Sequence, residues 1–161
     1  GRVGGEAPVV GLLDVVDPAE RFGGAESEFI ATELAAWVAR SHRAPLWLLG
    51  KAAGGADGER NASRLLGNVA LALQRVAKVV AKPLLIEAGA TAVLDAASDT
   101  GLLALGFPDD WQQRGLGVVR AAIAPDTRPP VLAVRNGTRP SGLSPDIALT
   151  RFRWTFAGSQ V

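Results

Sequence analysis

Few side chains in this sequence are suited to catalysing a reaction. The 161 residues contain no cysteine and no tyrosine, and His42 is the single histidine. These counts exclude disulfides, thiolate nucleophiles, cysteine-based zinc sites and any site with several histidine ligands. Arg40 and Arg43 flank His42 at the predicted end of a helix, where cations are favoured. We therefore interpret this histidine as a helix-end residue, and we expect no catalytic residue and no metal site.

The remaining candidates for functional residues are aspartates that follow either an apolar run or a glycine. Asp14 and Asp17 come at the end of the first apolar run, and Asp109 and Asp110 follow soon after Gly106. An enzyme such as a nucleotide hydrolase would need a base, and the two later aspartates or the histidine would have to provide it. The histidine is predicted at the opposite side of the sheet from the strand carboxyl ends. We therefore predict a protein that is not an enzyme.

The elements that would position these residues alternate regularly between strand and helix. Near-continuous apolar runs are typical of parallel strands that are buried on both faces. Five such runs cover residues 8–16, 45–49, 84–86, 102–105 and 130–134. Helices are predicted between them at 26–41, from Ser63 to before Pro83, at 91–98, and from near Gln113 or Leu116 to Ala124. This order predicts an α/β fold, a five-stranded parallel sheet with helices on both faces.

The predicted sheet also indicates where a ligand would bind. Parallel sheets bind ligands beyond the carboxyl ends of their strands. Here those ends fall at residues 14–17, 50–51, 87–89 and 106–110. The stretch 54–58 is rich in glycine, and we expect it to be a flexible loop before the second helix.

The spacing of these elements resembles the universal stress protein family over residues 8–136. The likeness is strongest from Gly89 to Gly106 and in the segment Arg128-Pro-Pro-Val-Leu-Ala-Val-Arg135. The resemblance implies the adenine nucleotide alpha hydrolase-like fold of that family. It also implies a nucleotide loop after the fourth strand. The family pattern for that loop is Gly, two residues, Gly, nine residues, then Gly followed by Ser or Thr.

This chain departs from the family loop at most positions. Gly106 fits the first position, but Asp109 stands at the second. Gly115 or Gly117 would begin the last helix at a shortened interval, and Val118 provides no hydroxyl group. Glycines let the backbone approach phosphates, and a helix N-terminus attracts anions. The resemblance also implies an acidic contact with the adenosine part of the ligand, and spacing does not decide between the two aspartates after the first strand, Asp14 and Asp17.

The acidic replacements argue against ATP as a ligand. Two like charges about 4 Å apart repel by about 4 kcal/mol at an effective dielectric of about 20. That repulsion offsets several hydrogen bonds to a phosphate, each worth about 1.5–3 kcal/mol. A shared Mg²⁺ ion would reverse the sign of this effect. We therefore predict no cofactor. The alternative is an adenine nucleotide such as AMP, ATP or a cyclic nucleotide, of which a ligand with one phosphate would be tolerated better.

The tail of the chain differs from the rest. Residues 138–161 begin with a segment rich in Pro, Gly and Ser, and Phe152, Trp154 and Phe156 then alternate with Arg151, Arg153 and Thr155. This alternation predicts a half-buried strand that extends the sheet or pairs with another subunit. The alternative interpretation is that these side chains form a surface on which the bases of single-stranded nucleic acid stack. Because 17 Lys and Arg oppose 16 Asp and Glu, we expect no nucleic-acid partner.

The predicted organisation is a flexible N-terminus at 1–7, an α/β domain at 8–137 and an extension at 138–161. The chain does not begin with Met, so we expect it to be part of a longer protein. No apolar run reaches the ~20 residues that span a bilayer, so we expect no membrane insertion by this fragment. The resemblance implies a homodimer, and a cytoplasmic regulatory domain attached to a membrane transporter such as a cation/proton antiporter. The alternative function is adenine-nucleotide sensing.

Overall fold

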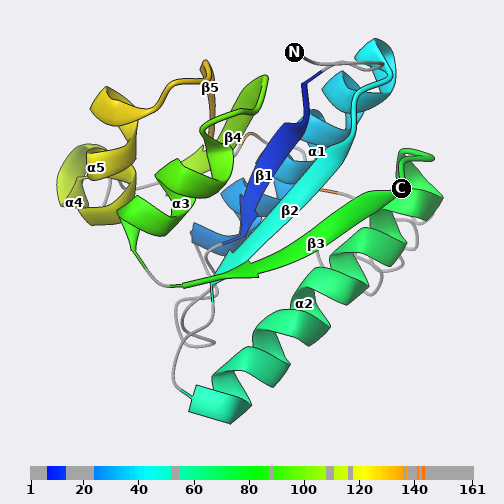
Figure 1. The fold of residues 1–161 in the computed structure, drawn as a ribbon, viewed down its shortest axis with the longest axis horizontal. Coiled ribbons are helices and arrows are strands. Elements are labelled where there is room, and N and C mark those ends of the chain that lie inside the picture. Colours follow the sequence, from blue (N-terminus) through cyan, green and yellow to red (C-terminus); the bar gives the residue numbers. More distant parts are fainter. Residues whose placement is uncertain are drawn as a thin grey trace, which may run out of the picture.

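The computed structural model describes residues 7–13, 24–51, 55–87, 89–107, 111–115 and 118–135, together with Gly137, Ser141 and Leu143. Strands and helices alternate along the chain (Figure 1). The strands are β1 (Val9–Leu13), β2 (Leu46–Lys51), β3 (Ala81–Ile86), β4 (Leu102–Phe107) and β5 (Val131–Arg135). The helices are α1 (Gly24–His42), α2 (Gly55–Val76), α3 (Ala90–Ala97), α4 (Trp111–Arg114) and α5 (Val118–Asp126).

The strands form one parallel sheet in the order β3-β2-β1-β4-β5. Strand β1 lies at the centre, where Gly11 is in register with Leu48 of β2 and Ala104 of β4. Two edges remain, β3 at one side and β5 at the other. This topology confirms the predicted α/β fold class and its five-stranded parallel sheet.

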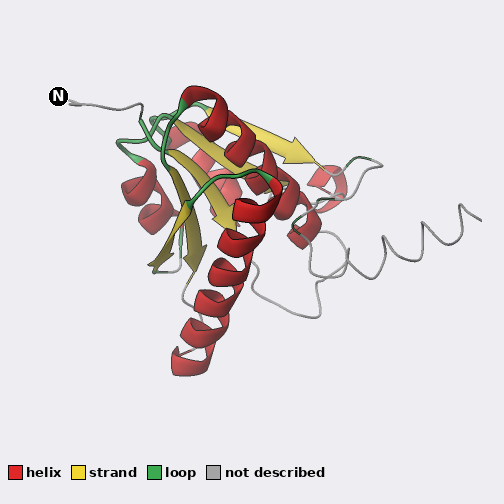
Figure 2. Cartoon of the chain, turned by 90° about the vertical axis from the view of Figure 1, so that its right-hand side faces the viewer, coloured by secondary structure: helices red, strands yellow, loops and turns green. Residues whose placement is uncertain are grey.

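Two hydrophobic clusters fill the two faces of the sheet. Successive residues of β1 point to opposite faces, so Val9 and Leu13 join the cluster under α1 and α2, while Val10 and Leu12 join the cluster under α3 and α5. This is why the first strand has a continuous apolar sequence. In the perpendicular view of Figure 2, the longest helix, α2, lies in front of the strands.

Helix α2 and strand β3 differ from the prediction. The helix begins at Gly55, within the stretch expected to be a flexible loop, and ends at Val76. Its first turn carries Asp57, which pairs with Arg60 and lies where the helix dipole favours negative charge. Strand β3 begins before Pro83 because an edge strand can accommodate a residue without a backbone N–H group.

Two short helices replace the single helix that was predicted after β4. Helix α4 ends at Arg114, and Gly115 follows with a φ of 79°, in the left-handed region that favours glycine. The backbone N–H of Gly115 donates to the carbonyl oxygen of Trp111 at 2.8 Å. Glycine in this conformation commonly terminates a helix. Helix α5 then begins at Val118.

Two described residues of the C-terminal extension contact the body of the domain. Leu143 is 4% exposed and belongs to the hydrophobic cluster under α1 and α2. The Ser141 hydroxyl donates to Oε2 of Glu33 in α1 at 2.8 Å. The predicted strand around Phe152, Trp154 and Phe156 lies outside the described residues, as do residues 1–6. In the described ranges, no helix combines the length and the apolar character that crossing a bilayer requires.

Candidate functional site

The predicted site residues divide into two groups. Gly106 is the last residue but one of β4, Gly115 terminates α4, and the backbone of Val118 begins α5. The other predicted site residues lie outside the described residues, namely Asp14, Asp17, Asp109 and Gly117. The described group therefore places the candidate site at the carboxyl end of β4, and the ligand-binding roles of all these residues remain predictions.

Gly106 lies directly against the backbone of α1. A Cβ atom at this position would be 2.4 Å from the backbone nitrogen of Glu28 and 2.5 Å from the carbonyl carbon of Ser27. Contacts this short do not occur between real Cβ atoms and backbone, so any other residue would push the helix away. In this structure the glycine is therefore required for the packing of α1 on β4. The neighbouring segment that approaches it closely is protein backbone.

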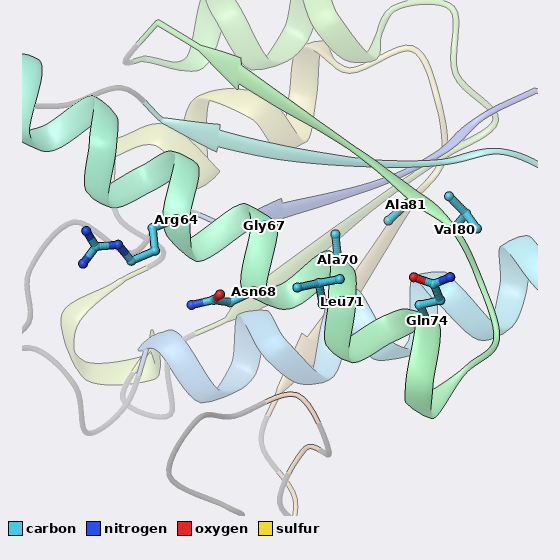
Figure 3. A pocket seen from close by; sticks show the side chains of 8 residues that line it. All are labelled: Arg64, Gly67, Asn68, Ala70, Leu71, Gln74, Val80 and Ala81. Carbon is cyan, nitrogen blue, oxygen red and sulfur yellow. The ribbon is translucent and has the colours of Figure 1, made fainter.

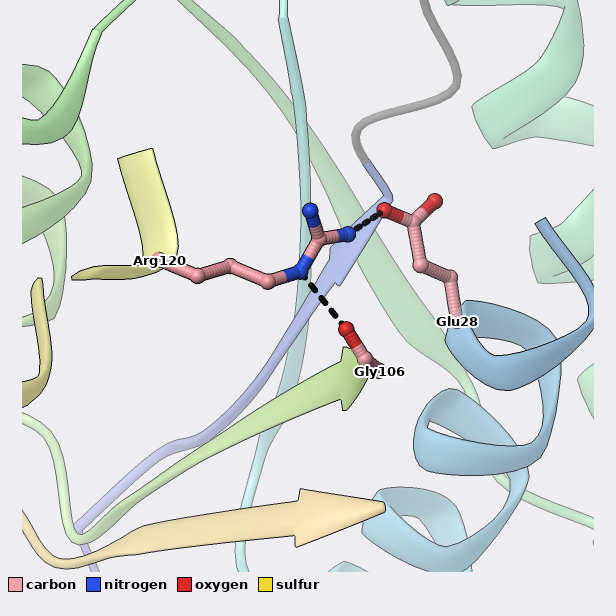
Figure 4. Close-up of polar contacts among 3 residues, drawn as sticks. All are labelled: Glu28, Gly106 and Arg120. Carbon is pink, nitrogen blue, oxygen red and sulfur yellow. Dashed lines mark hydrogen bonds and ion pairs between the residues drawn. The ribbon is translucent and has the colours of Figure 1, made fainter. Parts of the chain in front are cut away.

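An ion pair bridges the two helical layers at the same place. The Arg120 side chain reaches from α5 past the end of β4, and its guanidinium pairs with the carboxylate of Glu28 on α1 (Figure 4). Its Nε also donates to the Gly106 carbonyl oxygen at 2.6 Å. The Glu28 side chain is 2% exposed and that of Arg120 is 14% exposed. Buried charges of this kind are stable only when they are paired and hydrogen-bonded.

This arrangement decides what the end of β4 can recognise. A guanidinium is a strong ligand for phosphate and carboxylate groups because it offers paired N–H donors. Here the Arg120 guanidinium already forms an ion pair with the carboxylate of Glu28, and its Nε donates a hydrogen bond to the Gly106 carbonyl oxygen. An incoming phosphate would have to displace Glu28 or approach a buried negative charge.

Aromatic side chains hold together the two ends of the loop that follows β4. The rings of Phe107 and Trp111 lie 6.2 Å apart at an interplanar angle of 55°. Tilted aromatic pairs at this distance are mutually stabilising. Phe107 ends β4 and Trp111 begins α4, so this contact fixes the first turn of α4 beside the end of the strand.

His42 is remote from this cluster. It is the last residue of α1, which runs antiparallel to the strands, so it lies near the amino ends of the strands and is exposed. This confirms its predicted position at a helix end. Across the described part of the chain, no group of three or more histidine, aspartate or glutamate side chains could hold a metal ion.

Sequence reasoning missed the two charged residues that define the site. Glu28 shares a helix face with Thr32, Ala35 and Ala39, each of which is buried. This spacing of four, three and four residues marks a helix stripe that faces the core. A glutamate on such a stripe indicates a buried carboxylate that needs a cation. The partner could not be identified in the same way, because it lies 92 positions further along the chain.

The class of this protein's fold follows from comparison with known proteins. No protein-family model matches the chain, and no curated protein sequence matches it. Solved structures do match. A universal stress protein from Archaeoglobus fulgidus is 16% identical, with a TM-score of 0.64 over 80% of this chain and 93% of that one. The five-stranded parallel sheet with helices on both faces is therefore a fold of the universal stress protein type.

Two further solved structures support the same assignment. A universal stress protein solved in complex with cAMP is 17% identical, with a TM-score of 0.58 over 83% of this chain and all of that one. A member of the universal stress protein family from Burkholderia pseudomallei is 18% identical, with a TM-score of 0.53 over 81% and 96% of the two chains. The chain has the universal stress protein fold, as predicted from its sequence.

Proposed function

We propose that this chain is a non-catalytic regulatory or interaction domain that does not bind ATP at the carboxyl end of β4. The observation that carries this proposal is the contact of Arg120 with both Glu28 and the Gly106 carbonyl. The position that a phosphate would take beside this guanidinium is already held by a carboxylate of the same chain.

Electrostatics supports the exclusion of a triphosphate. At an effective dielectric of about 20, a phosphate charge about 4 Å from the Glu28 carboxylate would be repelled by about 4 kcal/mol. Each hydrogen bond to a charged group returns only about 1.5–3 kcal/mol. The backbone of Ser27 and Glu28 also lies against Gly106, where a bound phosphate would need space. Retaining a triphosphate would thus require both the helix and the ion pair to move.

The proposal extends to the setting in which the domain acts. We expect it to regulate a larger protein, such as a cation/proton antiporter or a related membrane transporter, from the cytoplasmic side. We also expect a homodimer. An edge strand provides unpaired backbone groups for such a contact, and β5 is an edge of this sheet. The basis for the transporter and for the dimer remains the family resemblance in the sequence.

Isothermal titration with ATP, with and without Mg²⁺, tests the central claim. We expect no binding, or a dissociation constant weaker than about 100 µM, which corresponds to about −5.5 kcal/mol. Replacing both Glu28 and Arg120 by methionine gives the informative variant, because it removes the arginine without leaving a buried carboxylate unpaired, and it should leave this result unchanged. Micromolar ATP affinity without metal, lost in this double variant, would contradict the proposal.

Adenine-nucleotide sensing is the second candidate function. The supporting observation is that a solved universal stress protein with this fold holds cAMP. A ligand with one phosphate carries less charge than ATP, so it is repelled less by Glu28. Titration with cAMP and AMP in parallel with ATP separates the two functions. Saturable binding of cAMP or AMP that is weakened in the double methionine variant of Glu28 and Arg120 would favour the sensor.

A further inference from the structure

A surface groove lies between α2 and the start of β3, near the amino ends of the strands. It has a volume of about 450 Å³ and is lined by residues that include Arg64, Asn68, Leu71, Gln74, Val80 and Ala81 (Figure 3). Leu71 is 61% exposed and Val80 is 79% exposed. Exposed apolar side chains that line one groove are typical of a contact surface for another molecule.

The same region is strongly cationic. From Arg64 to Ile86 the sequence contains Arg64, Arg75, Lys78 and Lys82 but no aspartate or glutamate, although the whole chain has a net charge of only +1. All four cations are exposed. Within the described residues, none of them pairs with a carboxylate. Lys78 lies two residues before Val80 at one end of the groove, and Arg64 lies at the other. Lys82 is on the opposite face of β3, which it shares with Leu84 and Ile86 of the cluster under α3 and α5.

A second copy of the chain does not suit this surface. A two-fold contact brings the same patch of each subunit together, so the cations of one copy would face the same cations of the other. Strand pairing along β3 is also disfavoured, because Lys82 and Pro83 are the residue types that protect an exposed sheet edge. The positive charge of the surface therefore favours an acidic partner over a second copy of the chain.

The shape of the surface favours a peptide segment over a flat membrane. The apolar side chains line a groove, which a projecting side chain can enter. Amphipathic helices bind proteins in this way, with apolar anchors in the groove and polar residues at its rim. An acidic segment would place its carboxylates near the cations at the two ends of the groove.

We propose that the α2–β3 groove docks an acidic amphipathic segment of a partner protein. Apolar side chains of the segment contact Leu71 and Val80, and its carboxylates face Arg64 and Lys78. This inference rests on the proposed role of the chain as an interaction domain. It uses a different surface, because Ala81 begins β3 near the amino ends of the strands, whereas the candidate site lies at the carboxyl end of β4.

The probe is a fluorescent synthetic peptide of about 15 residues, rich in glutamate, with leucines at helical i, i+3, i+4 and i+7 positions. Fluorescence anisotropy with the intact chain should give saturable binding that weakens with salt. The double variant Arg64→Glu/Lys78→Glu should weaken binding at least tenfold, and Leu71→Ser should weaken it severalfold. Arg128→Glu, at an exposed cation between α5 and β5, and Leu34→Ser, at an exposed leucine of α1, are the matched controls and should change little.

Several results would overturn the proposal. Absence of saturable binding would do so, as would equal binding of a peptide with the same composition but scrambled leucines. Equal losses in the control variants would show that the α2–β3 groove is not the site. Tighter binding to vesicles of anionic phospholipid than to the peptide would assign the surface to a membrane instead. ATP titration reports on the end of β4, so the proposed function and the docking site can fail independently.

Discussion

Arg120 in α5 and Glu28 in α1 form a buried ion pair across the end of β4, although 92 positions separate them in the sequence. The two helices lie on opposite faces of the sheet, with one contributing to each hydrophobic cluster. The pair therefore joins the two layers at the carboxyl ends of the strands, where ligands of parallel sheets bind. Its contribution to stability can be measured with variants of one partner and of both.

Removing one partner of this pair should destabilise the domain strongly. Glu28→Ala leaves the Arg120 guanidinium partly buried and without its carboxylate, which typically costs about 3–5 kcal/mol. Replacing both residues by methionine should recover most of this loss, because it leaves no uncompensated charge. Urea denaturation gives the free energies of unfolding. Glu59→Ala, at an exposed glutamate of α2, is the control and should change stability by less than about 0.5 kcal/mol. An equally small effect of Glu28→Ala would show that the pair is not buried as described.

Gly106→Ala should also destabilise the domain, because the added methyl group would meet the backbone of Ser27 and Glu28. Overpacking of this kind typically costs about 1–3 kcal/mol, and here the obstacle is backbone that cannot rotate away. Gly67→Ala is the matched control, since Gly67 lies within α2 with open space around it. That substitution should stabilise the helix by about 0.5–1 kcal/mol. Thermal unfolding of both variants should therefore shift in opposite directions, and a stabilised Gly106→Ala would contradict the packing.

Gly115 is constrained by its conformation and not by its surroundings. Its φ of 79° is unfavourable for a side chain, while no atom lies within 4 Å of the position of a Cβ. Gly115→Ala should therefore cost about 1–2 kcal/mol, and Gly115→Asn should cost less, because asparagine tolerates the left-handed region. Chemical denaturation of the two variants would measure the difference. Equal stability of both variants and the parent would show that α4 does not end in this conformation.

The strands could be predicted because burial on both faces leaves a continuous apolar sequence. This holds for β1 and for β4, in which four consecutive residues, Leu103 to Gly106, are buried. Local rules failed at two places, in β3 and at the start of α2. Pro83 predicted the end of a helix, but it lies inside β3, where the edge position removes the requirement for its N–H group. Glycines before Ser63 predicted a loop, but the first turns of α2 form there.

The sequence predicted that the candidate site follows the fourth strand, but it did not predict which residues surround Gly106. A glycine at the end of β4 indicates that something approaches the backbone closely, but the residue type does not reveal whether that is a ligand or another part of the chain. In the structure it is the backbone of Glu28 that lies beside Gly106. The arginine that completes the cluster comes from a helix beyond the loop, and its role depends on the packing of both layers against the sheet.

The last prediction concerns the extension after β5. Leu143 is 4% exposed in the cluster under α1 and α2, so Leu143→Ala should cost about 2–5 kcal/mol of unfolding free energy. Ser141→Ala should cost about 0.5–1.5 kcal/mol, because it removes the hydrogen bond to Glu33. Leu71→Ala is the matched control, since that leucine is 61% exposed and should matter little. If urea denaturation gave the same small change for Leu143→Ala as for Leu71→Ala, the extension would not be part of the folded core. A large loss would instead mean that the core of this domain includes residues beyond its fifth strand.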